Sequence, residues 1–506
     1  MTAFQLKAAV SAMALLVAGP ALADVTAQQV WDDWQAQMAI YGESAVTIGS
    51  ETYEGGVLTV TDLGFNVTGE DGSTATGNLP ELVLTENGDG TVTVTMSEDY
   101  PISISTPANA ETGSAASEVD LALRQTGLEM TVSGDPGALT YDLSAARYAL
   151  ELDGVTEDGA EVPAEALFAF NDITGSYTST AGTMREIAYD LAAASMDLLV
   201  DATNPEDSSH VMVSGKVSDV ATQATMTMPL DPAADPEMMM MNGLAMEGGY
   251  TTGGGQYIFE FTDASGPTNG TFSTESGSLN IQFSKDSIAY DGSATNVALN
   301  ATSAAMPIPV DVSIGEYGFN FAMPMSKTDA PAPWALGLSL RDLALNDEVW
   351  AIFDPQALLS HDPATVAVDL SGTATLLFDV MDPAQAEAMS AAPVPGQVDS
   401  VDINEFNIAF GGASVTGTGA FTLDNTDMTT FPGMPKPTGA VDLQLSGVKG
   451  LINNLVAIGI VPQDQVMIAM GMLGAFATET APDQLTSRIE ATEDGRLLVN
   501  GNPLPM

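Results

Sequence analysis

The stretches ASVTGTGAFTLD (residues 413–424) and GAVDLQLSG (residues 439–447) alternate apolar and small polar residues with a period near two. This alternation is typical of β-strands. After them comes LINNLVAIGIVPQDQVMIAMGMLGAFA (residues 451–477), a nearly uncharged run that a central proline divides into two short helices. The closing run LTSRIEATEDGRLLVNGNPL (residues 485–504) predicts a hairpin that turns at its Glu-Asp-Gly. The C-terminal end therefore predicts a β-layer with an apolar helix pair packed on it.

Most of the remaining chain follows the strand pattern. Apolar residues make up 45% of the sequence and charged residues only 16%, a composition typical of a large β-structure with many short turns. One helix is predicted at the N-terminal end, in VTAQQVWDDWQAQMAIYG (residues 25–42). We expect its Trp31 and Trp34 to anchor this helix to the sheet, since large aromatic side chains are usually buried.

Two stretches in the middle of the chain resemble each other. ITGSYTST is echoed by MEGGYTTGGG, and the segment Ser214 to Pro229 is echoed by Asp291 to Pro307, with Gly215 and Gly292 aligned. The pattern predicts repeated β-units over residues 173–229 and 246–307, which would lengthen the sheet by stacking. A Pro/Ala-rich joint at 323–337 predicts a boundary between two β-rich regions, residues 24–325 and 335–506.

The N-terminal residues 1–23 have the order of a secretory signal peptide. Lys7 precedes an apolar run from Ala8 to Ala18, and Ala21-Leu22-Ala23 provides a small-residue cleavage site before Asp24. The apolar run is shorter than the about 20 residues that a membrane-spanning helix needs. Since the chain contains no cysteine, we expect export to a periplasm and no disulfides or lipoprotein anchor. We expect no transmembrane helix in the mature chain.

The charge of the chain restricts its partners. The chain has 67 acidic and 12 basic residues, a formal net charge of −55. A surface of this charge repels phosphate backbones, so nucleic acid is excluded as a partner. An acidic disordered tail is also excluded, because apolar strand patterning extends throughout the chain.

A family resemblance rests on three groups of residues: the helix with Trp31 and Trp34, the pattern LALND…W…FDP…HDPATVAVDLSG (residues 343–372), and the closing GRLLVNGNPL (residues 495–504). Together they resemble a family of uncharacterised alphaproteobacterial periplasmic proteins, which are β-rich and have no assigned activity. More distantly, the chain resembles the AsmA-like envelope proteins, whose elongated, curved sheets are thought to shield lipid. The combined prediction is a mainly β fold, in which an elongated, curved antiparallel sheet of repeated β-units carries an N-terminal helix and a C-terminal apolar helix pair, residues 451–477.

Residues for catalysis are scarce. The two histidines, His210 and His361, are far apart in sequence, and without cysteine the usual zinc sites and thiol nucleophiles are excluded. No G-x-S-x-G elbow, phosphate loop or H-E-x-x-H pattern occurs. Carboxylate pairs for glycoside cleavage stay possible among 67 acids, although solvation explains so many acids more simply. We therefore expect a protein that is not an enzyme and has no cofactor or metal.

Apolar surface provides the candidate site. The second helix of the pair is apolar on all sides, so it must be buried in protein or meet lipid; core burial is the favoured explanation. If the helices instead line a groove of the sheet, they would bind an acyl chain, with the Met-rich segment PEMMMMNGLAMEGG (residues 236–249) as an adaptable lip. A copper(I) site is the alternative for the methionines. The candidate ligand-binding residues are Val466, Met470, Leu473, Phe476, Met239 and Met240.

Three functions remain open. The first is a soluble periplasmic protein that binds or shields a lipid-like ligand in the cell envelope. The second is a structural or assembly protein that binds an envelope protein through its sheet edges. The third and weakest is an outer-membrane β-barrel, since the chain does not end in an aromatic strand and aromatic residues make up only 6% of it.

Overall fold

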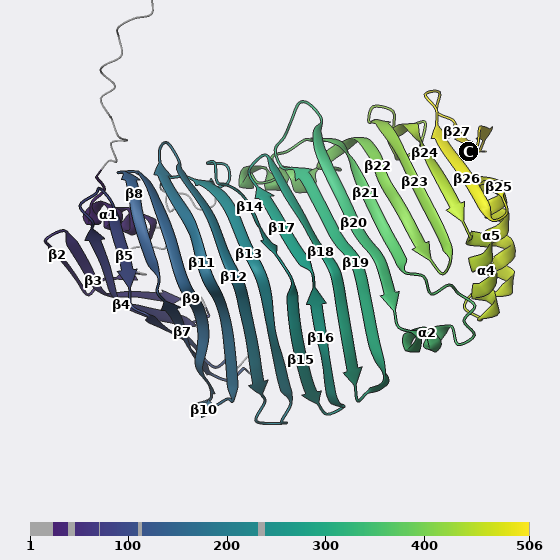
Figure 1. The fold of residues 1–506 in the computed structure, drawn as a ribbon. Helices are drawn as coiled ribbons and strands as arrows, with labels where there is room; N and C mark the ends of the chain where they lie inside the picture. Colours follow the sequence, from purple (N-terminus) through teal and green to yellow (C-terminus); the bar gives the residue numbers. More distant parts are fainter. Residues whose placement is uncertain (1–23, 39–45, 70, 110–113, 231–237, 505–506) are drawn as a thin grey trace, which may run out of the picture.

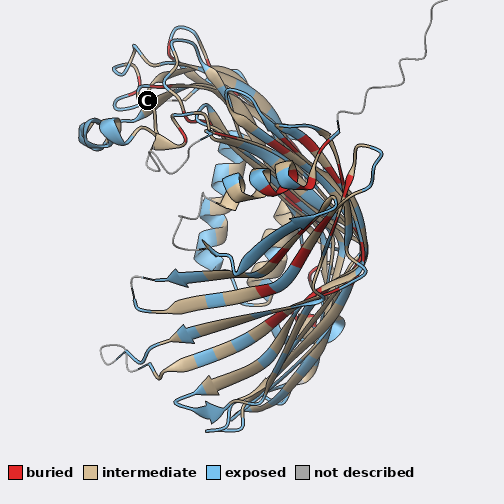
Figure 2. Ribbon diagram, turned by 90° about the vertical axis from the view of Figure 1, so that its left-hand side faces the viewer, coloured by how far each residue is buried: buried red, intermediate tan, exposed pale blue. Residues whose placement is uncertain are grey.

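Neighbouring strands pair antiparallel from one end of the chain to the other and form one 28-stranded sheet (Figure 1). The computed structural model describes residues 24–38, 46–69, 71–109, 114–230 and 238–504; the predicted signal peptide, residues 1–23, lies outside them. The sheet curves into an open trough with a concave and a convex face (Figure 2). The predicted mainly β fold, with one elongated, curved antiparallel sheet, is confirmed.

The elements up to the middle of the chain are α1 (Ala27–Met38), β1 (Val46–Thr47), β2 (Ser50–Glu54), β3 (Val57–Thr68), β4 (Thr74–Glu86), β5 (Val92–Met96), β6 (Asp99–Thr106), β7 (Ser117–Thr126), β8 (Glu129–Asp135), β9 (Ala138–Glu157), β10 (Ala160–Glu161), β11 (Ala164–Ala181), β12 (Arg185–Thr203), β13 (His210–Met228), β14 (Ala245–Thr252) and β15 (Gly255–Asp263). The remaining elements are β16 (Gly266–Thr274), β17 (Ser276–Phe283), β18 (Ser287–Ser303), β19 (Met306–Pro324), β20 (Ala332–Leu345), α2 (Asp347–Phe353), β21 (Ala364–Leu376), η4 (Pro383–Gln385), α3 (Ala386–Ala391), β22 (Gly396–Phe410), β23 (Ala413–Asp424), β24 (Lys436–Ser446), α4 (Val448–Ala457), α5 (Gln463–Phe476), β25 (Thr478–Ala481), β26 (Gln484–Ala491), β27 (Leu497–Val499) and β28 (Asn502–Pro503).

Two parts of the sheet share one topology. Between the long strands β13 and β18, the sheet is filled by two rows of short strands: β14 pairs with β17 in one row, and β15 pairs with β16 in the other. Between β4 and β9 the rows are β5 with β8 and β6 with β7, connected in the same order. The sheet therefore contains a repeated β-module, at β4–β9 and at β13–β18. The bounds predicted for the repeated units, residues 173–229 and 246–307, differ from these, because residues 173–229 belong mainly to the long strands β11–β13. The sheet also continues through the Pro/Ala-rich joint, because β19 pairs directly with β20.

Short interruptions of the strand pairing, which we call bulges, lie near the midpoints of the long strands and, in β20, near its C-terminal end. The bulge residues share a left-handed backbone, with φ between 47° and 55°, and each drops out of the cross-strand pairing; they are Asp62, Asp172, Asp219, Asn296 and Asp342. Asp and Asn tolerate this conformation better than other residues with side chains. A left-handed residue changes the direction of an otherwise extended strand, so these positions contribute to the curvature of the trough.

The N-terminal helix α1 lies on the concave face and covers the main hydrophobic core (Figure 2). Trp31 and Val30 are fully buried against residues of β4 and β5, such as Leu82 and Val94. Trp34 packs partly buried against the same core. The prediction that both tryptophans anchor this helix to the sheet is confirmed.

At the other end of the trough, α4 and α5 lie beside β24 and β26. The predicted hairpin is present as the β26–β27 pair. The backbone N–H groups of Lys449 and Gly450 donate to the two carboxylate oxygens of Asp483, both at 3.0 Å, which fixes the first turn of α4. The favoured explanation for the apolar second helix was core burial, and this was wrong: no residue of α5 is buried. Met467 is 80% exposed, because α5 packs on the sheet by one side only.

Candidate functional site

The two faces of the sheet differ in chemistry, as β15 illustrates. Alternate side chains of a strand point to opposite faces. Tyr257, Phe259 and Phe261 share the face that carries α1 and α4–α5, whereas Gln256 and Glu260 point to the other face. The concave face of this strand is therefore aromatic and its convex face polar.

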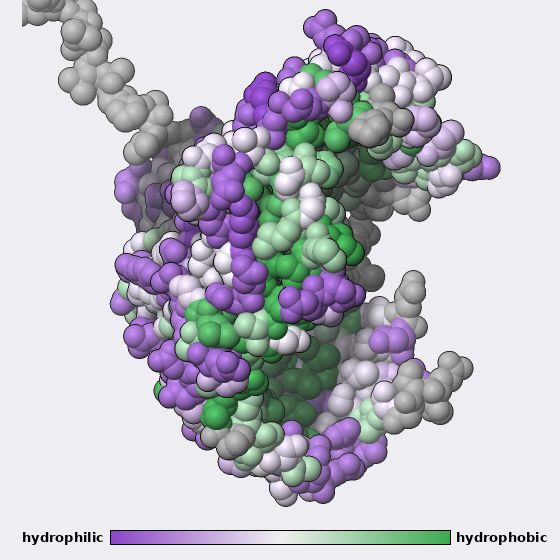
Figure 3. Space-filling view, turned by 90° about the vertical axis from the view of Figure 1, so that its right-hand side faces the viewer, coloured by the Kyte–Doolittle hydropathy of each residue, from purple (hydrophilic) through white to green (hydrophobic). Residues whose placement is uncertain are grey.

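The strand register extends this division along the trough. Phe259 lies opposite Val213, which lies opposite Val200, and the same face continues to Ala166 of β11. The bulges do not disturb this division between an apolar and a polar face. Each bulge residue takes no position in the inward–outward alternation of side chains, so the apolar residues before and after it share the concave face. We call the concave-facing residues of β9–β24 the concave row. Viewed from the C-terminal side, apolar surface lines the hollow of the trough and hydrophilic surface covers its outer side (Figure 3).

Much of the concave row is exposed to solvent. Leu336 and Leu338 of β20 are 50% and 48% exposed. Among the large apolar residues of β9–β23 that are exposed, Ile258 is the one on the convex face in the described part of the chain. The others belong to the concave row: Leu150, Phe168, Tyr189, Val200, Val211, Met246, Tyr250, Phe261, Met306, Tyr317, Phe321, Leu336, Leu338, Val366, Val398, Ile408 and Phe410.

Three apolar cavities follow the concave face. The first, of about 500 Å³, lies beside α1 and is bounded by Trp34, Met38 and Tyr177. The second, of about 440 Å³, is open and lies over Phe259, Phe261 and neighbouring residues of the central strands. The third, of about 370 Å³, lies under α4 and α5. Cavities of 300–1,000 Å³ with mainly apolar lining are typical of small-molecule sites.

A buried polar network joins α1 to the sheet at the N-terminal end of the trough. Arg185 of β12 donates to Asp33 of α1 at 2.9 Å and to the Ser179 hydroxyl at 2.7 Å, and both ionic side chains are 11% exposed. Tyr177 donates to Gln37 at 2.7 Å and Tyr141 donates to Asp33 at 3.3 Å. Burial, together with the Asp33 carboxylate, raises the pKa of Tyr141 far above its usual value, so this phenol stays protonated. The network therefore fixes α1 to the sheet.

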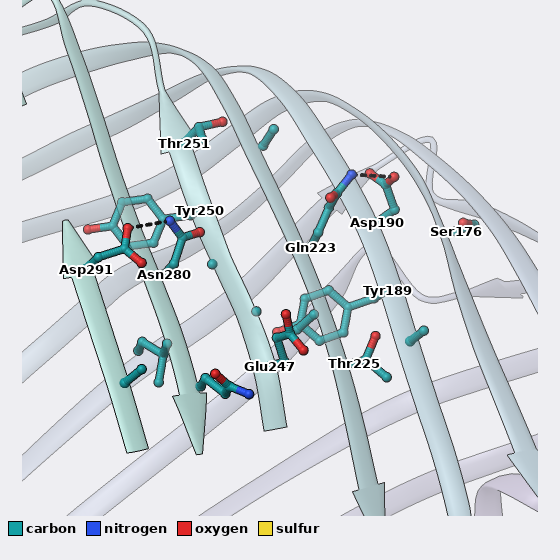
Figure 4. Close-up of a pocket in the computed structure, with 18 of the residues that line it drawn as sticks. Ser176, Tyr189, Asp190, Gln223, Thr225, Glu247, Tyr250, Thr251, Asn280 and Asp291 are labelled. Atoms are coloured by element: carbon teal, nitrogen blue, oxygen red, sulfur yellow. Dashed lines mark hydrogen bonds between the residues drawn. The ribbon is translucent and has the colours of Figure 1, made fainter. Parts of the chain in front are cut away.

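A wide hollow of about 870 Å³ lies mainly over convex-face residues of β11–β18 (Figure 4). Small side chains such as Ala188, Ala221 and Ala289 leave this space. Two of its polar groups are joined across strands: Gln223 donates to Asp190 at 2.9 Å, and Asn280 donates to Asp291 at 2.8 Å. In the described residues no three His, Asp or Glu side chains are grouped so that they could hold a metal ion. The hollow is an open surface of mixed polar and small apolar side chains.

The structure separates the candidate residues predicted from the sequence. Leu473 and Phe476 line the cavity under α5, and Val466 and Met470 are half-buried on the same helix. Met239 and Met240 precede β14 instead, and Met240 is buried. Eight strand spacings separate β14 from β24, roughly 40 Å along the sheet. The methionines therefore do not form a lip beside the helix pair.

Sequence reasoning did not select the concave row as a site. Phe168, Phe261 and Leu336 belong to strands of the concave face, and no sequence motif singles them out. The sequence does contain one signal for the concave row: it predicts many strands with an apolar face and too few helical residues to cover those faces. The described helices lie at the ends of the trough or, like α2, at strand connections.

The two histidines occupy separate places. His361 stacks on Trp350 with ring centroids 4.4 Å apart, and its Nε2 lies 3.7 Å from the buried carboxylate of Asp354. His210 lies 2.9 Å from Asp201 on a distant strand. His361 therefore belongs to a packed loop that joins α2 to β21.

Comparison with known protein families gave one match, in the C-terminal half of the chain. Residues 256–505 match a family described as "Uncharacterized protein conserved in bacteria (DUF2125)". A DUF2125 domain covers residues 256–505. In the structure this DUF2125 domain begins with β15 and includes the helix pair. Comparison with curated proteins and with solved structures gave no match. Within the described residues, no helix has both the length and the apolar character to span a bilayer.

Proposed function

We propose that this protein binds or shields a lipid-like ligand in the concave trough, within the cell envelope, and that it is not an enzyme. The observation that carries the proposal is the concentration of exposed large apolar side chains on the concave row. Monomeric proteins rarely expose large contiguous apolar patches unless the patch binds something. An acyl chain lying along the trough would remove this surface from water.

The energetics favour an acyl chain as the occupant. Each buried methylene contributes about 0.8 kcal/mol, so a long chain gains enough to offset the cost of its immobilisation. The aromatic pairs Phe168–Phe170, with ring centroids 5.0 Å apart, and Phe259–Phe261, at 5.5 Å, offer flat apolar surface in the central trough. The interior positions of the concave row in β11–β24 carry no charged side chain among the described residues, so no buried charge opposes the ligand.

Two expectations from the sequence agree with this proposal. Residues 1–23 have the order of a secretory signal peptide, which would deliver the chain to a periplasm. The AsmA-like envelope proteins, which the chain distantly resembles, are thought to shield lipid with elongated, curved sheets. A trough with a polar outer face and an apolar inner face suits a protein that carries a lipid tail through water or shields it from water.

The proposal is tested by titrating the mature protein with a fluorescent fatty acid in the absence of detergent. Phe261→Asp, Leu336→Asp and Leu338→Asp, combined in one variant, place charges on the concave row at positions that already contact solvent. We expect affinity to fall by roughly a hundredfold or more, since a carboxylate in an apolar site is costly. Ile258→Asp is the matched control, because Ile258 is equally exposed but on the convex face. Equal binding by the triple variant and the wild type would disprove the proposal.

A further inference from the structure

Helix α5 presents an apolar stripe on the side that faces away from the sheet. Met467, Ile468 and Met472 are 80%, 65% and 55% exposed, and Ile460 in the preceding turn is 56% exposed. At 100° per residue the three helical positions fall on one side of α5, together with Gly471 and Ala475, whereas Val466, Ala469 and Leu473 fall on the other side. We call Ile460, Met467, Ile468 and Met472 the α5 stripe. Large apolar side chains are usually buried, so the exposure of the α5 stripe to solvent is unusual.

The α5 stripe lies next to the trough. The cavity under the helix pair is lined by Leu443, Leu445 and Ile489, which belong to the concave face of β24 and β26. Met472 and Phe476 line this same cavity, and the residues as a whole are 55% and 42% exposed. Apolar surface is therefore continuous from the outer side of α5, around the edge of the helix, to the floor of the trough.

The charge of this region differs from that of the rest of the chain. Residues 448–476 contain one basic residue, Lys449, and one acidic residue, Asp464, so their formal net charge is zero in a chain of net charge −55. Lys449 is paired with Glu479, with Nζ and the carboxylate oxygen 2.7 Å apart. Acidic surface is repelled by the anionic headgroups of a bilayer, whereas a neutral apolar helix is not.

We propose that the α5 stripe inserts into the surface of a lipid bilayer and that acyl chains pass between the bilayer and the trough around Met472 and Phe476. The passage of acyl chains into the trough rests on the proposed function of the trough. A helix that lies in the membrane interface buries one apolar side and keeps its other side on a polar support. In this protein the folded sheet supplies the support, because the opposite side of α5 faces the sheet across the cavity under the helix pair.

The test is flotation of the full mature protein with phosphatidylcholine vesicles at physiological salt, in parallel with fluorescent fatty-acid titration in solution. The variant Met467→Asp/Ile468→Asp charges the α5 stripe at two positions that do not line the cavity. We expect its vesicle affinity to fall by roughly tenfold or more, while its affinity for the soluble fatty acid stays at the wild-type level. The convex-face control Ile258→Asp is expected to retain both activities.

The outcomes separate this inference from the proposed function. Wild-type flotation that the double variant retains would overturn the bilayer assignment, as would a wild-type protein that does not float. If that non-floating wild type sediments as a dimer and the double variant as a monomer, a second copy of the chain covers the stripe instead. Flotation without any fatty-acid binding would leave the bilayer contact standing and reject the trough as a lipid site.

Discussion

Asp219 in β13 and Asn296 in β18 adopt the same left-handed backbone conformation, with φ angles of 51° and 47°. They lie 77 residues apart, at aligned positions of the similar stretches that contain Gly215 and Gly292. At each of them the neighbouring part of the sheet divides into its two rows of short strands. Two bulges with the same backbone conformation thus interrupt the long strands β13 and β18 on either side of the short strands β14–β17, where the sheet divides into two rows.

Replacing Asp219 by valine should destabilise the sheet at this bulge. A β-branched residue in the left-handed region costs about 1–2 kcal/mol, so the free energy of unfolding should fall by that amount. Urea denaturation of the purified protein measures the change. Asp219→Asn is the control and should stay within about 0.5 kcal/mol of wild type, since asparagine occupies the matching position in β18.

Replacing Gly215 by valine should also destabilise the protein, for a different reason. The ring of Tyr257 on β15 lies across Gly215, and a side chain at that position would collide with it. Overpacking of this kind costs about 1–3 kcal/mol. Gly154→Ala in β9 is the matched control, because nothing lies within 4 Å of a Cβ atom added there. Equal urea midpoints for the two variants would show that the contact with Tyr257 carries no constraint.

Arg185→Met should release α1 from the sheet. The substitution leaves the carboxylate of Asp33 buried without its charged partner, and breaking a buried pair in this way costs about 3 kcal/mol. Tryptophan fluorescence, recorded in a background in which Trp334 and Trp350 are replaced by phenylalanine so that it reports on Trp31 and Trp34, should shift at a lower urea concentration than in the same background with Arg185. Arg488→Met removes the exposed pair with Asp442 and should cost less than about 1 kcal/mol.

Stability should fall in acid in part because of Asp354. Burial acts to raise the pKa of its carboxyl group, but hydrogen bonds from the backbone N–H groups of Leu359 and Leu358 outweigh burial and lower it. A carboxyl group whose pKa is lower in the folded state stabilises the fold above its unfolded-state pKa of about 4 and loses that contribution as pH falls through the folded-state pKa. Asp354→Asn should therefore weaken the protein at neutral pH and flatten its loss of stability below about pH 4. Thermal unfolding at several pH values measures both effects, and an unchanged acid profile would contradict the assignment.

The sequence predicted the fold class because alternation in strands such as β23 and β24 is a local property. It also predicted the helix with Trp31 and Trp34, since apolar residues recur there with a period of 3.6. Two large aromatic side chains on one helix favour packing of that helix against the sheet. The division of short strands into two rows was not predictable in this way. It depends on pairing between strands that are distant in sequence, such as β14 with β17 and β16 with β18.

The site was harder to predict than the fold. Alternation shows that Phe168 and Leu336 share a face with other apolar residues, but not whether another layer covers that face. The apolar sequence of α5 was similarly ambiguous, because burial and contact with lipid both require such a helix. Only the arrangement of the elements, with α1 and α4–α5 at opposite ends of the trough, reveals that much of the concave row between them is exposed to solvent.

The most direct test of the lipid-binding trough is native mass spectrometry of the mature protein, purified from its own compartment without detergent, combined with extraction and analysis of bound lipid. We predict a stoichiometric acyl-bearing species in the wild type and in Ile258→Asp, and its absence from the folded variant Phe261→Asp/Leu336→Asp/Leu338→Asp. A wild-type protein that carries no lipid and takes up none from added fatty acid would contradict the account.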